Sequence, residues 1–264
     1  MPMRCTVQEA PACARFKTLR SYLALIRFHY HCSFVIVLLG VLTVTRNFTL
    51  DLVSSLVTLY VSFNVLLYGG LYTVNAIADS RSDRLHRSKR NRPVASGAIT
   101  HTAAAWTAAA LITAGFATAM LLFDGRIIGL YAAFVAVNLT YTFVARRLAG
   151  IELLVNAATY PLRYLLGAYV AGGTVSAYLP GLVFLVAIGA CALRRSVEGS
   201  PQYSRRVLLA IEVAALVGIA LLRLPDHRNH DVFYYCAAGT FVVLVFGTES
   251  LALMRRAFLR FWTK

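Results

Sequence analysis

The sequence predicts an all-α membrane protein, a polytopic bundle of about eight transmembrane helices. Three observations predict this class. Of the 264 residues, 59% are hydrophobic. Only 14% are charged, against about 25% in an average soluble domain. The charge is also unbalanced, because 26 Lys and Arg stand against 11 Asp and Glu, which gives a formal net charge of +15.

The same numbers exclude other classes of protein. A soluble nucleic-acid-binding protein can carry such a basic excess, but not together with a mean hydropathy of +0.66 and long uncharged runs. The apolar content also excludes an intrinsically disordered chain. We therefore expect lipid, and no nucleic acid, around the protein.

Eight apolar runs define the expected spans. A helix needs about 20 apolar residues to cross the hydrocarbon core, and a lipid-exposed backbone satisfies its polar groups only as helix or closed barrel. In chain order the runs are 22–45, 52–75, 101–123, 127–145, 152–173, 178–194, 205–224 and 231–254. They predict one transmembrane domain over 22–254, between an N-terminal segment, 1–21, and a basic tail, 255–264.

The basic residues predict the orientation of these spans. Twenty-one of the 26 lie before or near the start of the first run, after the last, or in and beside the connections 76–100, 146–151 and 195–204. With eight spans, these places share one side of the membrane. By the positive-inside rule that side is the cytosol. We thus expect an integral, multi-pass protein with both termini and the long loop 76–100 in the cytosol.

A polar stripe runs down the second expected helix and into the loop. Its members are separated by steps of three or four residues, so they share one face if the helix continues past its span. They are Asn64, Tyr68, Tyr72, Asn75, Asp79 and Asp83. Two carboxylates with an amide one turn before them are oxygen ligands that suit Mg²⁺, which also keeps water and substrate phosphate in its shell.

A basic cluster follows the acids directly. It contains Arg84, His86, Arg87, Lys89, Arg90 and Arg92. Such side chains bind phosphate oxygens, and acids beside bases are the pattern of a metal–diphosphate site. The alternative is a solvated loop whose cations set topology or meet anionic lipid. That alternative explains the cations, but not carboxylates in helical register with a polar stripe.

Three stretches resemble the UbiA superfamily of intramembrane prenyltransferases. Residues 75–83 read NAIADSRSD and resemble its first aspartate-rich motif, NDxxDxxxD. Residues 83–97 read DRLHRSKRNRPVASG and are similar to its DRxHPxKxxRPxASG stretch. Residues 141–147 read YTFVARR and resemble its YSxxLKR segment. The resemblance follows the chain from about residue 25 to about 225.

The resemblance implies a helical bundle around a central cavity, with an opening toward lipid and a cytosolic cap of loops. It implies a Mg²⁺-dependent transferase that ionises an isoprenoid diphosphate, releases pyrophosphate and passes the prenyl group to a lipophilic, usually aromatic, acceptor. Asn75, Asp79 and Asp83 would be the catalytic, metal-binding residues. Lys89, Arg90 and Arg92 would contact the phosphates.

Two departures from the family pattern keep other activities open. Ala76 stands where the motif has its first aspartate. The second aspartate-rich motif is replaced by Arg194, Arg195 and Glu198 in the stretch RRSVE, which resembles the branch that transfers phosphoribose to decaprenyl phosphate. The alternatives are therefore phosphoribosyl transfer to a polyprenyl phosphate, terpene cyclisation, and a non-catalytic transporter or scaffold.

The remaining candidates are polar or aromatic residues in or near spans. Arg163 lies inside the fifth span, where a charge marks either a substrate-binding cavity or a buried structural partner. Arg194, Arg195 and Glu198 form either a polar cap or ordinary ion pairs. Arg27 reaches phosphate or anchors the interface. Tyr68 and Tyr72 either pack or stabilise a carbocation with their rings.

Overall fold

A computed structural model describes residues 11–87, 89–222, 231–250 and 252–256. Over these residues the regular structure is entirely helical, which confirms the expected class. The chain divides into two compact units that are described separately. Unit 1 contains residues 1–32 and 58–122, and unit 2 contains 33–57 and 123–264. The single domain expected over 22–254 stays a prediction, and of the expected tail only Arg255 and Arg256 are described.

The first expected span consists of three elements rather than one. They are α1 (Pro11–Ile26), the 3₁₀ segment η1 (Phe28–Phe34) and α2 (Val35–Val44). The break between α1 and η1 is at Arg27, whose φ is +52°. A non-glycine residue rarely adopts this left-handed conformation, because its Cβ crowds the following carbonyl.

The second expected helix continues well beyond its span. Three elements follow one another without a gap, namely α3 (Leu50–Leu59), the π-helical segment η2 (Tyr60–Tyr68) and α4 (Gly69–Leu85). The continuation through α4 fulfils the condition under which Asn75, Asp79 and Asp83 share a helix face. The π segment was not predicted. Such segments are rare and occur often at functional sites.

The six later helices match the six later runs to within a few residues. They are α5 (His101–Leu122), α6 (Gly125–Phe143), α7 (Ile151–Val170), α8 (Tyr178–Glu198), α9 (Arg205–Leu221) and α10 (Asp231–Ser250). Side-chain caps begin two of them. Asp124 accepts from the backbone N–H groups of Arg126 and Ile127, and Ser204 accepts from that of Val207.

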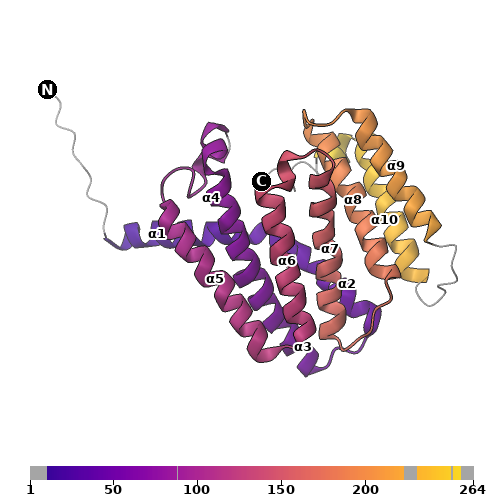
Figure 1. Ribbon diagram of the computed structural model, residues 1–264, viewed down its shortest axis with the longest axis horizontal. Helices are drawn as coiled ribbons and strands as arrows, with labels where there is room; N and C mark the ends of the chain where they lie inside the picture. Colours follow the sequence, from indigo (N-terminus) through magenta and orange to yellow (C-terminus); the bar gives the residue numbers. More distant parts are fainter. Residues whose placement is uncertain (1–10, 88, 223–230, 251, 257–264) are drawn as a thin grey trace. The chain divides into compact units, whose positions relative to one another are not determined.

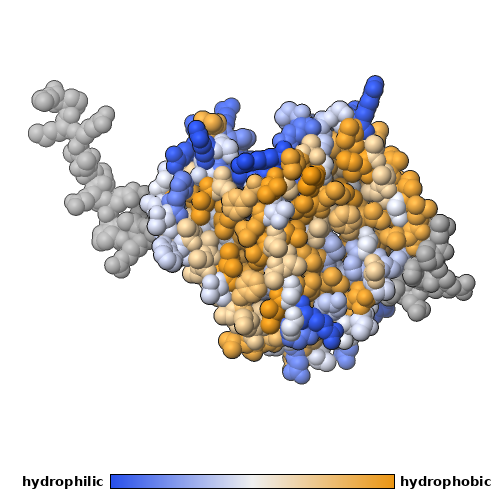
Figure 2. All heavy atoms as spheres, in the orientation of Figure 1, coloured by the Kyte–Doolittle hydropathy of each residue, from blue (hydrophilic) through white to orange (hydrophobic). Residues whose placement is uncertain are grey.

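Five helical stretches are long and apolar enough to cross a membrane, namely Leu19–Val44, Leu50–Leu85, His101–Leu122, Gly125–Arg147 and Tyr178–Glu198. Two of the helices outside this set differ from it in composition. In α10 the apolar stretch is shorter, Val232–Val245, and α7 carries the charged residues Glu152 and Arg163. Figure 2 shows hydrophobic side chains over the visible flanks of the helices and hydrophilic ones near helix ends. Exposed apolar flanks of this kind fit lipid rather than water.

Glycines bring α2 and α7 of unit 2 into close contact. A Cβ added at Gly40 would overlap the Tyr164 carbonyl oxygen, and one added at Gly167 would overlap that of Val37. The Thr43 and Tyr164 hydroxyls lie 2.7 Å apart at the same contact. In unit 2, α8, α9 and α10 also lie side by side (Figure 1) around a buried apolar cluster that includes Leu182, Ile219 and Phe241. Small residues thus allow the close helix packing that membrane proteins use.

Gly167→Ala should destabilise the protein by about 1–3 kcal/mol, because the new methyl group meets backbone that has no side-chain freedom to move away. A lower Tm of the purified protein in detergent would record the loss. Gly129→Ala on α6 is the matched control, since nothing lies within 4 Å of the added Cβ; it should stabilise by roughly 0.5–1 kcal/mol. Equal Tm values for the two variants would contradict the close contact.

Candidate functional site

The three predicted metal-binding residues, Asn75, Asp79 and Asp83, lie on the last turns of α4 in unit 1. Asn75 and Asp79 are partly buried, and Asp83 is buried. Asp83 accepts a hydrogen bond of 2.8 Å from Nη1 of Arg92. The structure therefore joins one predicted metal ligand to one predicted phosphate-binding cation, nine residues later in the chain. This ion pair fixes the orientation of both side chains.

The loop after α4 is ordered by its own backbone and by apolar packing. Turn-like hydrogen bonds join Ser96 to the Arg92 carbonyl and Ile99 to the Pro93 carbonyl. The side chains of Val94 and Ile99 pack with residues of α1, α4 and α5 in a buried cluster. The short 3₁₀ segment η3 (Lys89–Asn91) is exposed, so Lys89 and Arg90 reach outward from a fixed loop.

Ala76 belongs to the same buried cluster, together with Leu25 and Ala104. The position where the family motif has an acid is thus an apolar packing position here. Within the described part of the chain, no group of three or more His, Cys, Asp and Glu residues is arranged to hold a metal ion. The donors that remain are two carboxylates and one amide. This set fits Mg²⁺ that takes part of its ligands from substrate phosphate and water.

Aromatic rings and Arg27 form a second part of the candidate site in unit 1. The Arg27 guanidinium lies over the Tyr72 ring, 5.5 Å from its centroid. Tyr30 stacks on Tyr72, and the Tyr72 hydroxyl donates to that of Tyr68 over 2.6 Å. Nη2 of Arg27 is buried without a hydrogen-bond partner in the described structure. A partly buried cation whose unused donor is buried is suited to an anionic ligand.

Asn64, the first residue of the stripe, lies in the π segment and is fully buried. Its amide nitrogen is 3.5 Å from the His31 carbonyl oxygen, while its Oδ1 has no hydrogen-bond partner in the described structure. Nδ1 of His31 lies 2.9 Å from the Tyr60 hydroxyl. Because a buried polar atom without a partner is costly, Asn64 is retained at an energetic cost.

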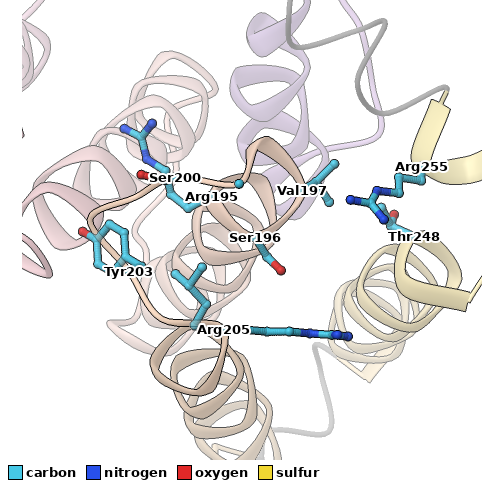
Figure 3. A pocket seen from close by; sticks show the side chains of 10 residues that line it. Arg195, Ser196, Val197, Ser200, Tyr203, Arg205, Thr248 and Arg255 are labelled. Atoms are coloured by element: carbon cyan, nitrogen blue, oxygen red, sulfur yellow. The ribbon is translucent and has the colours of Figure 1, made fainter.

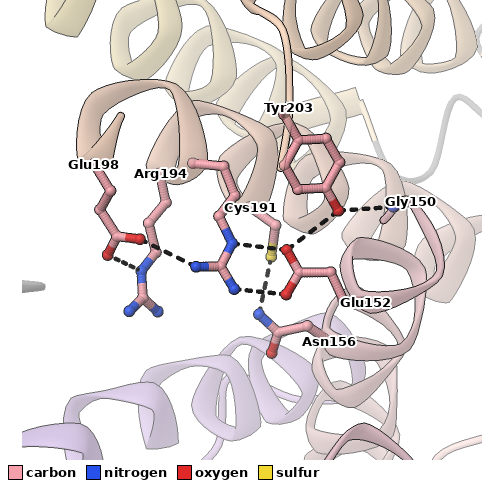
Figure 4. A network of polar contacts seen from close by, with 8 residues as sticks. Gly150, Glu152, Asn156, Cys191, Arg194, Glu198 and Tyr203 are labelled. Carbon is pink, nitrogen blue, oxygen red and sulfur yellow. Dashed lines mark hydrogen bonds and ion pairs between the residues drawn. The ribbon is translucent and has the colours of Figure 1, made fainter. Parts of the chain in front are cut away.

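In unit 2, Arg194, Arg195 and Glu198 belong to one ion-pair network (Figure 4). Arg195 donates to both carboxylate oxygens of Glu152 on α7, over 2.8 and 2.6 Å. Glu198 accepts from Arg194 over 2.8 Å and from Arg195 over 3.2 Å. Ordinary ion pairs, the alternative to a polar cap over the site, thus account for the contacts of Arg194, Arg195 and Glu198. Sequence reasoning missed Glu152, because its partner is 43 residues away in the chain.

Tyr203 completes this network from the α8–α9 turn. Its hydroxyl donates to Glu152 over 3.2 Å and accepts from the Gly150 backbone N–H over 2.7 Å. Burial raises the pKa of the Tyr203 phenol, so the hydroxyl stays protonated and keeps its donor role. The turn between α8 and α9 is thereby tied to the start of α7.

Glu152→Gln should destabilise the protein by about 3 kcal/mol, because it removes the charge that compensates a partly buried guanidinium. Glu198→Gln is the matched control. Its carboxylate is more exposed than that of Glu152, so its loss should cost under about 1 kcal/mol. Thermal unfolding of both purified variants measures the difference, and a larger loss at Glu198 would contradict this ranking.

Arg163 on α7 is buried among groups of its own unit. Its Nη1 donates to the Thr159 carbonyl over 3.1 Å and to the Thr159 hydroxyl over 2.9 Å. The guanidinium also lies 4.8 Å from the Phe134 ring centroid. These contacts support the alternative of a structural partner, and a role of Arg163 toward substrate stays a prediction.

Comparison with known proteins identifies one family. The model of the UbiA prenyltransferase family matches residues 33–258. A UbiA homologue from Archaeoglobus fulgidus, bound to GPP and Mg²⁺, has a similar structure with a TM-score of 0.72, 16% identity, and coverage of 91% of this chain and 95% of that chain. Digeranylgeranylglyceryl phosphate synthase gives a TM-score of 0.70 at 14% identity, over 93% and 95% of the two chains. At these identities the likeness shows the fold.

One curated relative with an assigned activity is the decaprenyl-phosphate phosphoribosyltransferase of Corynebacterium glutamicum. It is 30% identical over 124 residues, which are 45% of this chain and 36% of the relative. The other two curated relatives are matched over 27% and 41% of their length. The chain thus spans less than half the length of each of these curated relatives.

Proposed function

The chain belongs to the UbiA prenyltransferase family, and from this premise we propose that it is an intramembrane prenyltransferase. It would bind an isoprenoid diphosphate with Mg²⁺, release pyrophosphate and transfer the prenyl group to a lipophilic acceptor. The observation that carries the proposal is the α4 site, where Asn75 and two aspartates share a helix face and Asp83 is paired with Arg92. A cytosolic position of this site stays a prediction from the charge distribution.

Asn75, Asp79 and Asp83 would hold Mg²⁺ together with oxygens of the diphosphate. When bound, the ion supplies a Lewis acid that neutralises phosphate charge. Arg92 orients Asp83 through their ion pair. Lys89 and Arg90, exposed on η3, would contact the outer phosphate oxygens from the ordered loop.

Arg27 would bind the leaving pyrophosphate from the buried side. Its unused Nη2 donor supports this role, because a donor fixed before reaction stabilises developing negative charge at little reorganisation cost. As the allylic C–O bond breaks, its electron pair remains with the diphosphate and the prenyl carbon becomes cationic. That cation persists until the acceptor forms the new bond. Its stabilisation by the rings of Tyr68 and Tyr72 stays a prediction, because Tyr30 and the Arg27 guanidinium already contact the Tyr72 ring.

A second candidate is phosphoribosyl transfer from phosphoribosyl pyrophosphate to a polyprenyl phosphate. Two observations favour it, namely the Arg194, Arg195 and Glu198 replacement of the second acidic motif and the Corynebacterium glutamicum relative. The same α4 site serves both candidates, since both donors carry a diphosphate leaving group. Terpene cyclisation and a non-catalytic role have no such support.

A donor assay separates the candidates. Membranes containing the protein are incubated with isotopically labelled allylic diphosphates of several chain lengths and, separately, with labelled phosphoribosyl pyrophosphate, each with and without Mg²⁺. We expect Mg²⁺-dependent pyrophosphate release from an allylic donor. Release from the ribosyl donor alone would replace the first candidate by the second. If folded protein, identified by a cooperative thermal unfolding transition, released pyrophosphate from neither donor, both candidates would be refuted.

A further inference from the structure

Unit 2 contains a cavity of about 330 Å³ at the turn between α8 and α9, lined by residues of α8, α9 and α10 (Figure 3). Two polar features around it have structural explanations. Arg195 is paired with Glu152, and Ser204 caps the start of α9. The cavity thus gives no independent sign of a ligand. In unit 1, by contrast, polar side chains join two segments of irregular helix, η1 and η2.

The contact between η1 and η2 is centred on His31. The Tyr60 hydroxyl lies 2.9 Å from Nδ1 of His31, and the two rings meet edge to face. Asn64, four residues further along η2, donates from its amide to the His31 carbonyl oxygen in a long hydrogen bond of 3.5 Å. All three residues belong to unit 1. One residue of η1 is thus held at its ring and at its backbone by two residues of η2.

This arrangement is kept at a cost in free energy. Asn64 is fully buried, and its Oδ1 has no hydrogen-bond partner in the described structure, which is unfavourable for an acceptor. The 3₁₀ segment η1 has seven residues, although runs longer than three or four are uncommon because their hydrogen bonds are poorly aligned. Side-chain contacts are therefore needed to fix the position of η1.

Arg27 lies at the start of the segment that His31 holds. Three residues separate the two in sequence, and the Tyr30 N–H donates to the Arg27 carbonyl over 2.9 Å. Tyr30 also stacks on Tyr72, whose ring centroid is 5.5 Å from the Arg27 guanidinium carbon. Because a residue with a strained φ of +52° persists only where its surroundings hold it, these contacts set the place of Arg27.

We propose that Tyr60, His31 and Asn64 are positioning residues, which hold η1 so that Arg27 presents its buried donor to the leaving diphosphate. The inference rests on the proposed function, in which Arg27 binds the leaving pyrophosphate. Asn64, a substrate-binding candidate by its place in the polar stripe, acts through Arg27. A displaced donor stabilises developing charge less well, which lowers kcat more than it weakens substrate binding.

Two substitutions test the contact from η2. Tyr60→Phe removes one hydroxyl and keeps the ring, while Asn64→Ala removes the amide. The matched control is Tyr22→Phe, because Tyr22 is a partly buried tyrosine of α1 that packs against a different cluster. Each is made in the unmodified protein and in Arg27→Ala. Pyrophosphate release is measured over a range of donor concentrations, and binding of inorganic pyrophosphate with Mg²⁺ is titrated separately.

We expect Tyr60→Phe and Asn64→Ala each to lower kcat by about tenfold and to change KM for the donor by less than about threefold. The loss is smaller than the roughly 100-fold expected when a fixed donor is removed, because Arg27 is displaced rather than absent. Tyr22→Phe should stay within about twofold. In Arg27→Ala neither test substitution should lower kcat further, since residues that act through Arg27 are coupled to it.

A purely structural role would lower Tm and reduce kcat by the same factor with and without Arg27. Such losses, or an unchanged kcat in both test variants, would overturn the positioning role and leave the proposed function intact. If the unmodified protein releases pyrophosphate from no donor, the proposed function fails, and the titration decides. Weaker pyrophosphate binding in Tyr60→Phe only while Arg27 is present would support positioning, whereas equal binding, or none, in all variants would overturn it.

Discussion

Asp79→Asn should lower the rate of pyrophosphate release by at least about 1000-fold. The substitution keeps the shape of the side chain but removes one of only two carboxylates on the α4 face. With Ala76 buried in an apolar cluster, no third acid of the motif is present to compensate. Loss of metal-assisted charge neutralisation at a leaving diphosphate costs several kcal/mol of transition-state stabilisation, and each 1.36 kcal/mol is a factor of ten in rate.

The assay follows labelled pyrophosphate from the donor identified above, over a range of Mg²⁺ concentrations. Asp51→Asn is the matched control, because Asp51 is an exposed acid in the first turn of α3. It should leave the rate within about twofold. Asp79→Asn with an unchanged rate and Tm would remove the metal assignment. A lowered Tm would show instead that Asp79 acts on folding.

The membrane helices could be predicted because lipid allows the backbone few solutions. The six later apolar runs each became one helix with boundaries shifted by a few residues, while the first two are each divided among three consecutive helical elements. Asp83 and Arg92 could be predicted as one site for a related reason, since they lie only nine positions apart, at the end of α4 and in the loop that follows it. In both cases the information is local in sequence.

The details that depend on packing could not be predicted in this way. Glu152 and Arg195 meet across two helices, and no periodicity in either helix identifies the partner of the other. The π segment over Tyr60–Tyr68 adds residues to a turn without a proline or glycine signal in the π segment itself. The left-handed backbone at Arg27 was equally invisible, because arginine has no preference for that conformation.

The left-handed Arg27 leads to a prediction that separates stability from activity. Arg27→Gly should stabilise the backbone relative to Arg27→Ala by about 1 kcal/mol, because glycine adopts a positive φ without a Cβ clash. Both variants remove the buried guanidinium over Tyr72. Both should therefore lower pyrophosphate release by about 100-fold or more, as expected for the loss of one fixed donor to a developing anion.

Thermal unfolding and the donor assay, carried out on the same preparations, separate the two effects. Arg20→Ala is the control for charge alone, since Arg20 is exposed on α1, and it should change the rate by less than about twofold. If Arg27 only anchors the helix at the membrane interface, both Arg27 variants will resemble the Arg20 control. A higher Tm for glycine than for alanine, together with equal losses of rate, would mean that the strained backbone at residue 27 is maintained for the position of its guanidinium.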